Sequence, residues 1–357
     1  MAQPEMLQRA WVYATTQLTF TFLFLLYLLA LCFLGSLALH LLQDGPPRPF
    51  VDTLFLSASV TTTTGLLTVD ISAVTVGSQV VLFLLMLLGS PVLCSALFPL
   101  AKWLQLRAAL RELGARAAAQ GKPVAALASA HVVSMRELTR DATLFGAQLL
   151  AACFAAFFGV GLLIFLTYCS QGAPAALLAE RRVGALWFAT FHAMSTVNNV
   201  GVSLLTDSMA AFRSDSYMLL ATALLSIATG VGLPLLMRGV LWLLARARPG
   251  DARVRLLQQH PRVVFFNVFP FGITLQMLIW LVLFTAYQWV STIATDWNSG
   301  YWADVGAGER VLLAFFKAVM TRTTGFVASN VADSASADAF LDAIFMYIAA
   351  FPLCVLR

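Results

Sequence analysis

Phe55–Leu67, FLSASVTTTTGLL, is the stretch of sequence that decides the fold. It is a short apolar run that ends in four threonines and a glycine, followed by two leucines. Two later segments have the same form, because Phe191–Ser203 is FHAMSTVNNVGVS and Phe315–Phe326 is FFKAVMTRTTGF. A pattern that recurs at long intervals indicates an internal repeat. The sequence therefore predicts three tandem units.

Long apolar stretches flank each of these segments. Apolar residues occupy 60% of the 357 positions and charged residues 11%, whereas a soluble domain carries about a quarter charged residues. A helix needs about 20 apolar residues to cross a bilayer. The six predicted spans are Leu18–Leu42, Val74–Leu100, Ala142–Thr167, Tyr217–Leu244, Val263–Val290 and Ala339–Leu356. The predicted fold class is therefore all-α and integral to the membrane.

A short apolar segment leads into the glycine of each motif. These segments are Phe50–Val60, Val183–Thr196 and Glu309–Met320. Apolar stretches of about 10–14 residues are more often re-entrant or buried than membrane-spanning. We therefore expect each unit to consist of a helix, a re-entrant pore loop and a second helix, with the units arranged around a central pore.

The distribution of charge supports this arrangement. Basic residues gather in two linkers, after the second and fourth spans: Lys102, Arg107, Arg111, Arg116, Lys122, Arg136, Arg140, Arg238, Arg246, Arg248, Arg253, Arg255 and Arg262. Acidic residues dominate the other connections: Asp44, Asp52, Asp70, Glu180, Asp207, Asp215, Asp296, Asp304, Glu309, Asp333, Asp338 and Asp342. Positive loops stay cytoplasmic. The N-terminus and both basic linkers are therefore predicted to be cytoplasmic and the acidic loops external, so that the net charge of +5 reflects membrane orientation and not nucleic-acid binding.

Glycine and proline recur inside the second long span of each unit. They occur in Gly89–Pro91, in Gly230–Pro234 and, as proline alone, in Ala349–Pro352. Both residue types weaken or interrupt a helix. The second span of each unit is predicted to bend or break at these points.

A half-membrane helix followed by a glycine loop favours cation binding. The C-terminal end of a helix carries about half a negative elementary charge. Backbone carbonyls that face a pore replace the hydration shell of K⁺, and glycine supplies the backbone freedom and the space that such a loop needs.

These motifs resemble those of the Trk/Ktr/HKT family of K⁺ transporters, whose members carry four helix–pore loop–helix units in one chain around one pore. The resemblance covers nearly all of the sequence. FLSASVTTTTGLL is similar to the first filter of the family. FHAMSTVNNVGVS is similar to the second, where Asn-Asn-Ala-Gly-Phe is favoured, and FFKAVMTRTTGF to the third, where Arg-Thr-Ala-Gly-Phe is typical.

The resemblance implies K⁺ uptake across the membrane through a filter lined by carbonyls, with K⁺ as the transported ion, no other cofactor and no transition-metal site. The implied filter residues are Thr63, Thr64, Gly65, Leu66, Asn199, Val200, Gly201, Val202, Thr323, Thr324, Gly325 and Phe326. Serine in place of Gly65 is associated with Na⁺ permeation in the family, so glycine points to K⁺. The family pattern also assigns Arg322 to filter support, through hydrogen bonds to backbone carbonyls.

The resulting division of the chain gives three units and two basic linkers. Their bounds are 1–103, 142–245 and 263–357 for the units, and 104–141 and 246–262 for the linkers. The family's flexible intramembrane gate corresponds to Ala349–Leu353, where only Pro352 is kept. A fourth unit is not found. We expect roughly 100 further residues to supply it, and residues 1–357 alone to insert without supporting K⁺-selective uptake.

Two ionisable side chains inside the pore segments have simpler explanations. Lys317 is expected to extend its ammonium towards an interface. His192 is expected to be a hydrogen-bonded packing residue, with a proton relay as the alternative.

The resemblance also implies a location and partners. It implies a multi-pass protein of the inner (plasma) membrane, surrounded by lipid, that forms a homodimer and works with a cytoplasmic nucleotide-binding regulatory subunit. The linker Leu104–Asp141 is predicted to be an amphipathic helix, which either lies on anionic lipid or docks that subunit.

Two other function classes remain open. A non-conducting remnant or scaffold of the same fold would keep the spans without the pore. A membrane-embedded enzyme would need clustered catalytic groups, but the four histidines are dispersed and HExxH and GxSxG motifs are absent. The five cysteines form no CxxC pair, so neither zinc nor a disulfide framework is predicted.

The first prediction concerns Gly65. In the complete native protein, Gly65→Ser is expected to lower the preference for K⁺ over Na⁺, because carbonyl number and geometry set that preference. The measurement compares Rb⁺ and Na⁺ uptake in cells that lack their own K⁺ uptake. An unchanged ratio would count against the filter assignment.

Overall fold

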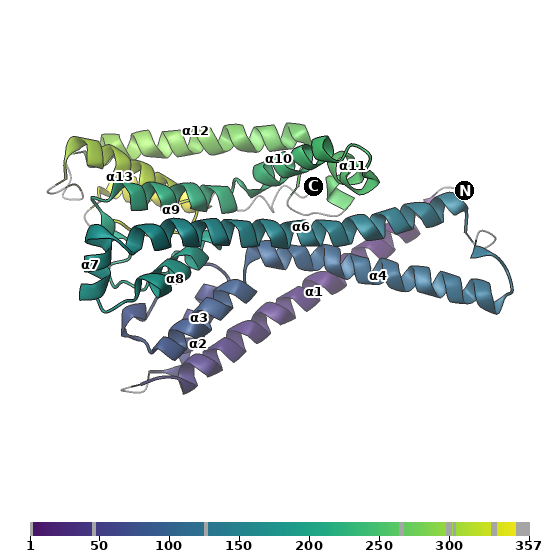
Figure 1. The fold of residues 1–357 in the computed structure, drawn as a ribbon, viewed down its shortest axis with the longest axis horizontal. Helices are drawn as coiled ribbons and strands as arrows, with labels where there is room; N and C mark the ends of the chain where they lie inside the picture. Colours follow the sequence, from purple (N-terminus) through teal and green to yellow (C-terminus); the bar gives the residue numbers. More distant parts are fainter. Residues whose placement is uncertain are drawn as a thin grey trace. The chain divides into compact units, whose positions relative to one another are not determined.

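The computed structural model describes residues 3–44, 48–124, 128–263, 268–297, 302, 305–329 and 334–347. Within these ranges the chain is helical and contains no strand, as predicted. The chain forms two compact units, residues 1–90 and 91–357, and each is described by itself (Figure 1).

The first compact unit contains three α-helices and a short 3₁₀ helix. They are α1 (Gln3–Leu41), α2 (Phe50–Thr61), η1 (Ile71–Ala73) and α3 (Val76–Leu88). Helices α2 and α3 pack against α1 and against each other (Figure 1). Small polar residues hold α2 to α1, since Ser57 Oγ donates to Cys32 O over 2.8 Å and Ser36 Oγ lies 3.2 Å from Thr53 Oγ1. Small residues let two helix backbones approach closely in a bilayer.

The second compact unit contains the remaining helices. They are α4 (Pro91–Ala119), α6 (Ala130–Cys169), α7 (Gly172–Glu180), α8 (Ala185–Val197), η2 (Ala210–Phe212), α9 (Ser216–Thr229), α10 (Leu233–Ala247), α11 (Ala252–Gln259), η3 (Pro261–Val263), α12 (Phe271–Asp296), α13 (Ala307–Met320) and α14 (Ser336–Tyr347). Helix α6 packs against α4, α8 and α11, while α13 packs between α9 and α12 (Figure 1). The short helices α2, α8 and α13 occur where the sequence predicts short segments.

Among the described residues, three helices are long and apolar enough to cross a membrane: α1, α6 and α12. Two further pairs meet the same condition when each pair is taken as one span, namely α3 with α4 and α9 with α10. Five of the six predicted spans therefore have a helical counterpart. The sixth begins in α14, and its continuation, including the predicted gate Ala349–Leu353, lies outside the described residues.

The spans with internal glycines are broken, as predicted. Helix α3 ends at Leu88 and α4 begins at Pro91. Helix α9 ends at Thr229, and α10 begins at Leu233 after a bend of 72°. Pro234 lies in the first turn of α10, where its missing N–H costs no hydrogen bond.

One predicted boundary and one predicted linker conformation are wrong. The span predicted from Val263 begins only at Phe271, because Pro270 precedes the helix with φ −54° and ψ 153°. The linker 104–141 is not a single amphipathic helix. Helices α4 and α6 instead extend from their spans into it and pack side by side (Figure 1).

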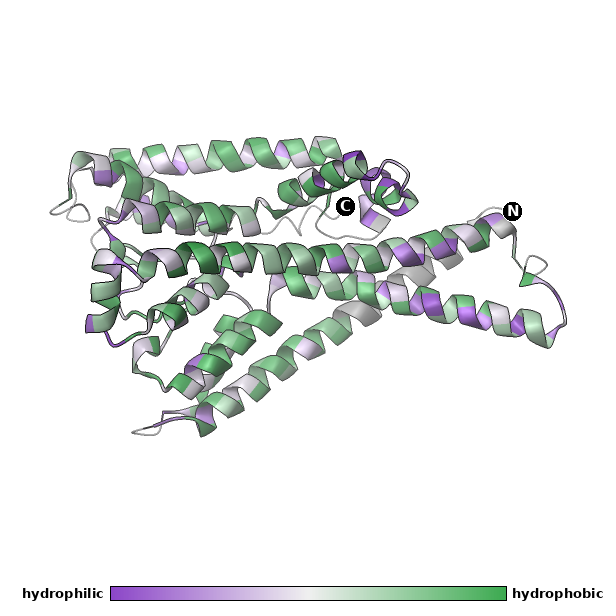
Figure 2. Ribbon diagram, viewed as in Figure 1, coloured by the Kyte–Doolittle hydropathy of each residue, from purple (hydrophilic) through white to green (hydrophobic). Residues whose placement is uncertain are grey.

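The second compact unit has charged ends and an apolar middle. Figure 2 shows hydrophilic residues on the parts of α4, α6 and α11 that belong to the basic linkers. Arg253 of α11 stacks on Phe145 of α6, with its guanidinium carbon 5.1 Å from the ring centre. At the other end of α6, Tyr168 Oη donates to Asp215 over 2.7 Å. Basic and acidic connections thus lie at opposite ends of α6.

Large apolar side chains cover the outside of α1 and α12. Leu34 is 61% exposed, Trp280 54% and Val282 58%. Apolar patches of this extent mark a surface whose surroundings are apolar. Together with the length of these helices, they identify lipid as the solvent for these faces.

The second prediction tests the break between α3 and α4. A methyl group added to Gly89 would lie 2.2 Å from the Thr61 carbonyl oxygen at the end of α2. Gly89→Ala is therefore expected to lower stability by about 1–3 kcal/mol, measured as a lower melting temperature of the purified protein in detergent. Gly159→Ala in α6 is the matched control, because no atom lies within 4 Å of the added methyl. Equal melting temperatures for the two variants would contradict this packing.

Candidate functional site

The short helices α2 and α8 end in the same kind of turn. The amide of Thr64 donates to Ser59 O over 2.8 Å, and the amide of Val200 donates to Ser195 O over 2.9 Å. In each case the donor lies five residues after the acceptor and immediately before the glycine of the motif. Bonds of this span close a helix with a left-handed residue. The sequence therefore turns sharply where each helix ends.

Left-handed backbone occurs at all three motif glycines. The φ angles are 76° at Gly65, 80° at Gly201 and 77° at Gly325. Residues with a side chain rarely adopt such angles. In the first two motifs the residue two positions earlier is also left-handed, with φ 56° at Thr63 and 55° at Asn199.

The third turn differs from the other two by one residue. Gly65 and Gly201 are the fourth residues after the ends of α2 and α8, whereas Gly325 is the fifth after Met320. Accordingly the amide of Gly325 itself donates to Met320 O over 2.8 Å. No left-handed residue precedes Gly325 within its described loop.

The second and third loops meet backbone to backbone. A methyl group added to Gly201 would lie 1.9 Å from the carbonyl oxygen of Thr324. The amide of Met209, after the second loop, donates to Val327 O over 2.9 Å. These contacts bring together two of the predicted filter segments. The first loop belongs to the other compact unit.

Burial differs between the loops. Asn199, Val200 and Val202 are buried, as are Thr324 and Phe326. In the first loop, Thr64 and Leu66 are exposed and the Oγ1 atoms of Thr62 and Thr64 lie 2.8 Å apart.

The side chain of Asn199 forms hydrogen bonds to the backbone at the break between α9 and α10. Its amide fits with the nitrogen donating to Ser226 O and the oxygen accepting from Gly230 N, both over 3.2 Å. Ser226 Oγ lies 3.5 Å from Thr324 Oγ1 of the third loop. One turn of α9 therefore contacts both loops. The sequence predicted that the backbone carbonyl of Asn199 lines the filter. It gave no signal for this contact of the Asn199 side chain.

His192 is a packing residue, as predicted. Its side chain is buried, with Nε2 3.0 Å from Thr222 Oγ1. The imidazole stacks on Phe188 and lies 4.8 Å, centre to centre, from the ring of Phe326. It thereby connects α8 with the residue that follows Gly325.

The two basic residues of the third segment have different surroundings. The guanidinium carbon of Arg322 lies 5.3 Å from the centre of the Phe284 ring, while Nε and Nη1 have no hydrogen-bond partner among the described residues. The predicted bonds to loop carbonyls are thus not made by these two nitrogens. For Lys317 the interfacial position is wrong, because its ammonium is buried among Asp296, Asp338 and Asp342. The sequence had placed these aspartates in external loops.

The electrostatics of the two joined loops favour a cation. Helices α8 and α13 both end at these loops, and each C-terminal end carries a partial negative charge. Carbonyls of the last turn of each helix accept bonds from loop amides, including Ser195 O from Val200 and Met320 O from Gly325. The arrangement is therefore a junction of two loops, each of which directly follows the C-terminal end of a short apolar helix.

Comparison with known proteins identifies the class as a membrane transport fold. The crystal structure of the potassium transporter TrkH from Vibrio parahaemolyticus superposes with a TM-score of 0.53 at 16% identity, over 90% of this chain and 55% of that one. The TrkH family model, described as a cation transport protein, matches residues 130–355. This chain belongs to the TrkH cation transport protein family.

Fungal relatives are more similar in sequence. A low-affinity potassium transport protein of Saccharomyces cerevisiae is 29% identical over 210 residues, which are 56% of this chain and 23% of the yeast protein. The potassium transporter TRK1 of Candida albicans is 27% identical over 183 residues, or 50% and 17% of the two chains. The matched part therefore spans about a quarter or less of these relatives.

The third prediction compares two glycines of the site. In the complete native protein, Gly201→Ala is expected to abolish uptake of Rb⁺, because the added methyl meets the Thr324 carbonyl. Gly325→Ala is the matched variant, since it has a similar φ but no atom within 4 Å of the methyl. It should lose only about 1–2 kcal/mol of backbone stability and keep measurable uptake. Equal loss in both, at equal membrane abundance, would show that the contact between the loops does not matter.

Proposed function

We propose that this chain forms part of a pathway for K⁺ uptake across the plasma membrane. The observation that carries the proposal is the junction of the second and third loops, where Gly201 packs directly against the carbonyl of Thr324. Membership of a cation transport family and the names of the fungal relatives support K⁺ as the ion.

In this proposal the backbone of each loop supplies the ligands. The filter residues are Thr63 to Leu66, Asn199 to Val202 and Thr323 to Phe326. Carbonyl oxygens take the place of the hydration shell of K⁺. The ends of the short helices add partial negative charge at the same level. Left-handed glycines with no side chain keep the loops close and the pathway open.

Arg322 supports the third loop in the same proposal. Its guanidinium lies over the ring of Phe284 on α12, which fixes its position beside the loop. A cation over an aromatic face is favourable in a desolvated setting.

The proposed orientation follows from the charged ends of α6. The linkers 104–141 and 246–262 are cytoplasmic, the N-terminus is cytoplasmic, and the acidic connections are external. The separation of Arg253 from Asp215 along α6 supports this, since basic segments remain inside. The same proposal divides the chain into units at 1–103, 142–245 and 263–357.

The proposed partners are a second copy of the protein and a cytoplasmic nucleotide-binding regulatory subunit. The extended ends of α4 and α6 give such a subunit a rigid basic surface. The guanidinium of Arg107 lies over Trp103 with its carbon 5.0 Å from the ring centre, so part of this surface is held in place.

The fourth prediction tests the function. The complete native protein, expressed in cells that lack their own K⁺ uptake, is expected to restore growth at limiting K⁺ and to take up Rb⁺ in preference to Na⁺. Gly201→Ala at equal membrane abundance is the matched negative control. Correct insertion with no cation uptake would favour a non-conducting scaffold of the same fold.

A further inference from the structure

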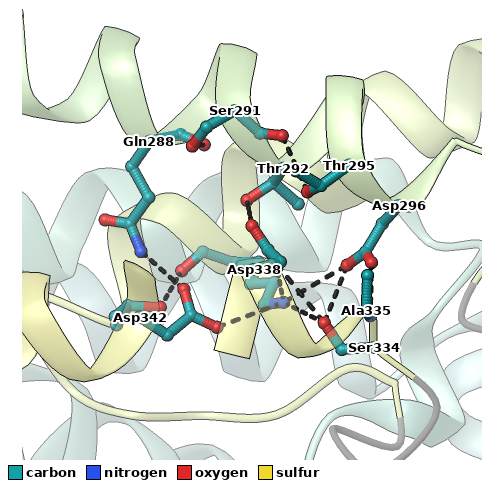
Figure 3. A network of polar contacts seen from close by, with 11 residues as sticks. Gln288, Ser291, Thr292, Thr295, Asp296, Ser334, Ala335, Asp338 and Asp342 are labelled. Atoms are coloured by element: carbon teal, nitrogen blue, oxygen red, sulfur yellow. Dashed lines mark hydrogen bonds and ion pairs between the residues drawn. The ribbon is translucent and has the colours of Figure 1, made fainter. Parts of the chain in front are cut away.

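Lys317 connects three helices at one buried point. It lies in α13, one turn before that helix ends. Figure 3 shows the carboxylates that gather here from two other helices, those of Asp296, Asp338 and Asp342. The Nζ atom lies 3.5 Å from Asp296 Oδ2 at the end of α12 and 3.1 Å from Asp342 Oδ2 in α14. It also forms a close ion pair with Asp338 of α14.

Each carboxylate is held by a second partner. The Asp296 carboxylate accepts from Ser334 Oγ over 2.8 Å and from the amide of Ala335 over 2.6 Å. Thr292 Oγ1 of α12 donates to Asp338 Oδ1 over 3.0 Å (Figure 3).

Gln288, one turn earlier on α12, holds the third carboxylate. Its Nε2 donates to Asp342 Oδ1 over 2.8 Å (Figure 3). The positions of the acidic groups are therefore fixed from α12 and from the start of α14 as well as by the ammonium.

Burial makes this cluster depend on the ammonium. Asp296 and Asp338 are fully buried, Asp342 is 5% exposed and Lys317 is 8% exposed. Removing one partner of a buried ion pair leaves an uncompensated charge, which is strongly unfavourable. Among the residues that the structure describes, no group of His, Cys, Asp or Glu has the geometry to hold a metal ion. The cluster thus acts as a cross-link between helices.

The cross-link adjoins the third loop. The Lys317 carbonyl accepts from the amide and the Oγ1 of Thr321, over 2.9 Å and 2.8 Å, where the loop begins. Lys317 and Asp342 also line a cavity of about 190 Å³ whose wall includes Gly325 and Phe326. Lys317 therefore lies one turn before the third loop, and the cluster and the loop share a cavity wall.

We propose that Lys317 is a positioning residue, which fixes the third filter loop by tying α13 to the end of α12 and the start of α14. The cluster places three carboxyl groups around one ammonium beside that loop. This inference rests on the proposed function, because it assigns Lys317 a role in cation selectivity and affinity.

The fifth prediction tests that role in the complete native protein. Lys317→Met keeps the length of the side chain and removes the charge. It is expected to raise the apparent KM for Rb⁺ by about tenfold, within the range by which neighbouring groups couple, and to lower the Rb⁺ to Na⁺ ratio. Lys317→Arg keeps the charge and should restore most of both values. The readouts are initial uptake rates normalised to the amount of protein at the cell surface.

A double variant distinguishes positioning from general damage. Asp342→Asn removes one negative charge, so Lys317→Met/Asp342→Asn should be less impaired than the sum of the two single changes. Uptake that falls only in proportion to surface protein, with KM and selectivity unchanged in Lys317→Met, would overturn the role of Lys317. If Lys317→Met does not reach the surface, Asp342→Asn decides, because it removes one of the carboxylates that Lys317 pairs with. A wild-type KM and wild-type selectivity in Asp342→Asn would then overturn the role of Lys317.

The wild-type protein separates this inference from the proposed function. Absence of Rb⁺ uptake by the wild type defeats the proposed function itself. Normal wild-type uptake with unchanged variants defeats only the role of Lys317.

Discussion

Each backbone amide or carbonyl that lacks a hydrogen-bond partner in hydrocarbon costs several kcal/mol. This constraint governs the loops, which are the part of the molecule that is not helical. The loops after α8 and α13 connect apolar helices, but their backbone does not continue the helical hydrogen-bond pattern. They are tolerated because each turn is closed by a bond back into its own helix and because the two loops pack on each other. Irregular backbone is accepted inside a membrane only where protein or a water-filled cavity surrounds it.

Several other features follow from the need to surround these loops. At the break between α9 and α10, the Asn199 amide contacts Ser226 O and Gly230 N, which are also bonded to each other over 2.9 Å. The imidazole of His192 packs against Phe326 beside the third loop. Behind the same loop, Lys317 and its three carboxylates join α12, α13 and α14. Burying a polar side chain in a bilayer costs free energy unless it is paired. The paired polar side chains of this chain lie beside the loops, which indicates that they stabilise the loop conformation.

Much of this could be predicted from the sequence because it rests on local signals. The length of apolar runs defines the spans, the repeated Gly and Pro residues locate the breaks, and the short runs before Gly65, Gly201 and Gly325 give α2, α8 and α13 within a few residues. Contacts between distant segments left no such signal. The sequence analysis assigned Asp338 and Asp342 to external connections and found no partner for Lys317, because their ion pairs join helices that are separate in the sequence. The start of α12 was missed because the apolar run continues before Pro270, whereas the helix begins immediately after this proline, at Phe271.

The central claim is that a cation passes along the backbone oxygens of these loops. The most direct measurement is a crystal structure of the complete native protein in Rb⁺ or Tl⁺, with anomalous scattering used to locate the ion. The account predicts an anomalous peak within coordination distance of carbonyls in Asn199–Val202 and Thr323–Phe326. Ion peaks that lie elsewhere in the protein, with none at these loops, would contradict it.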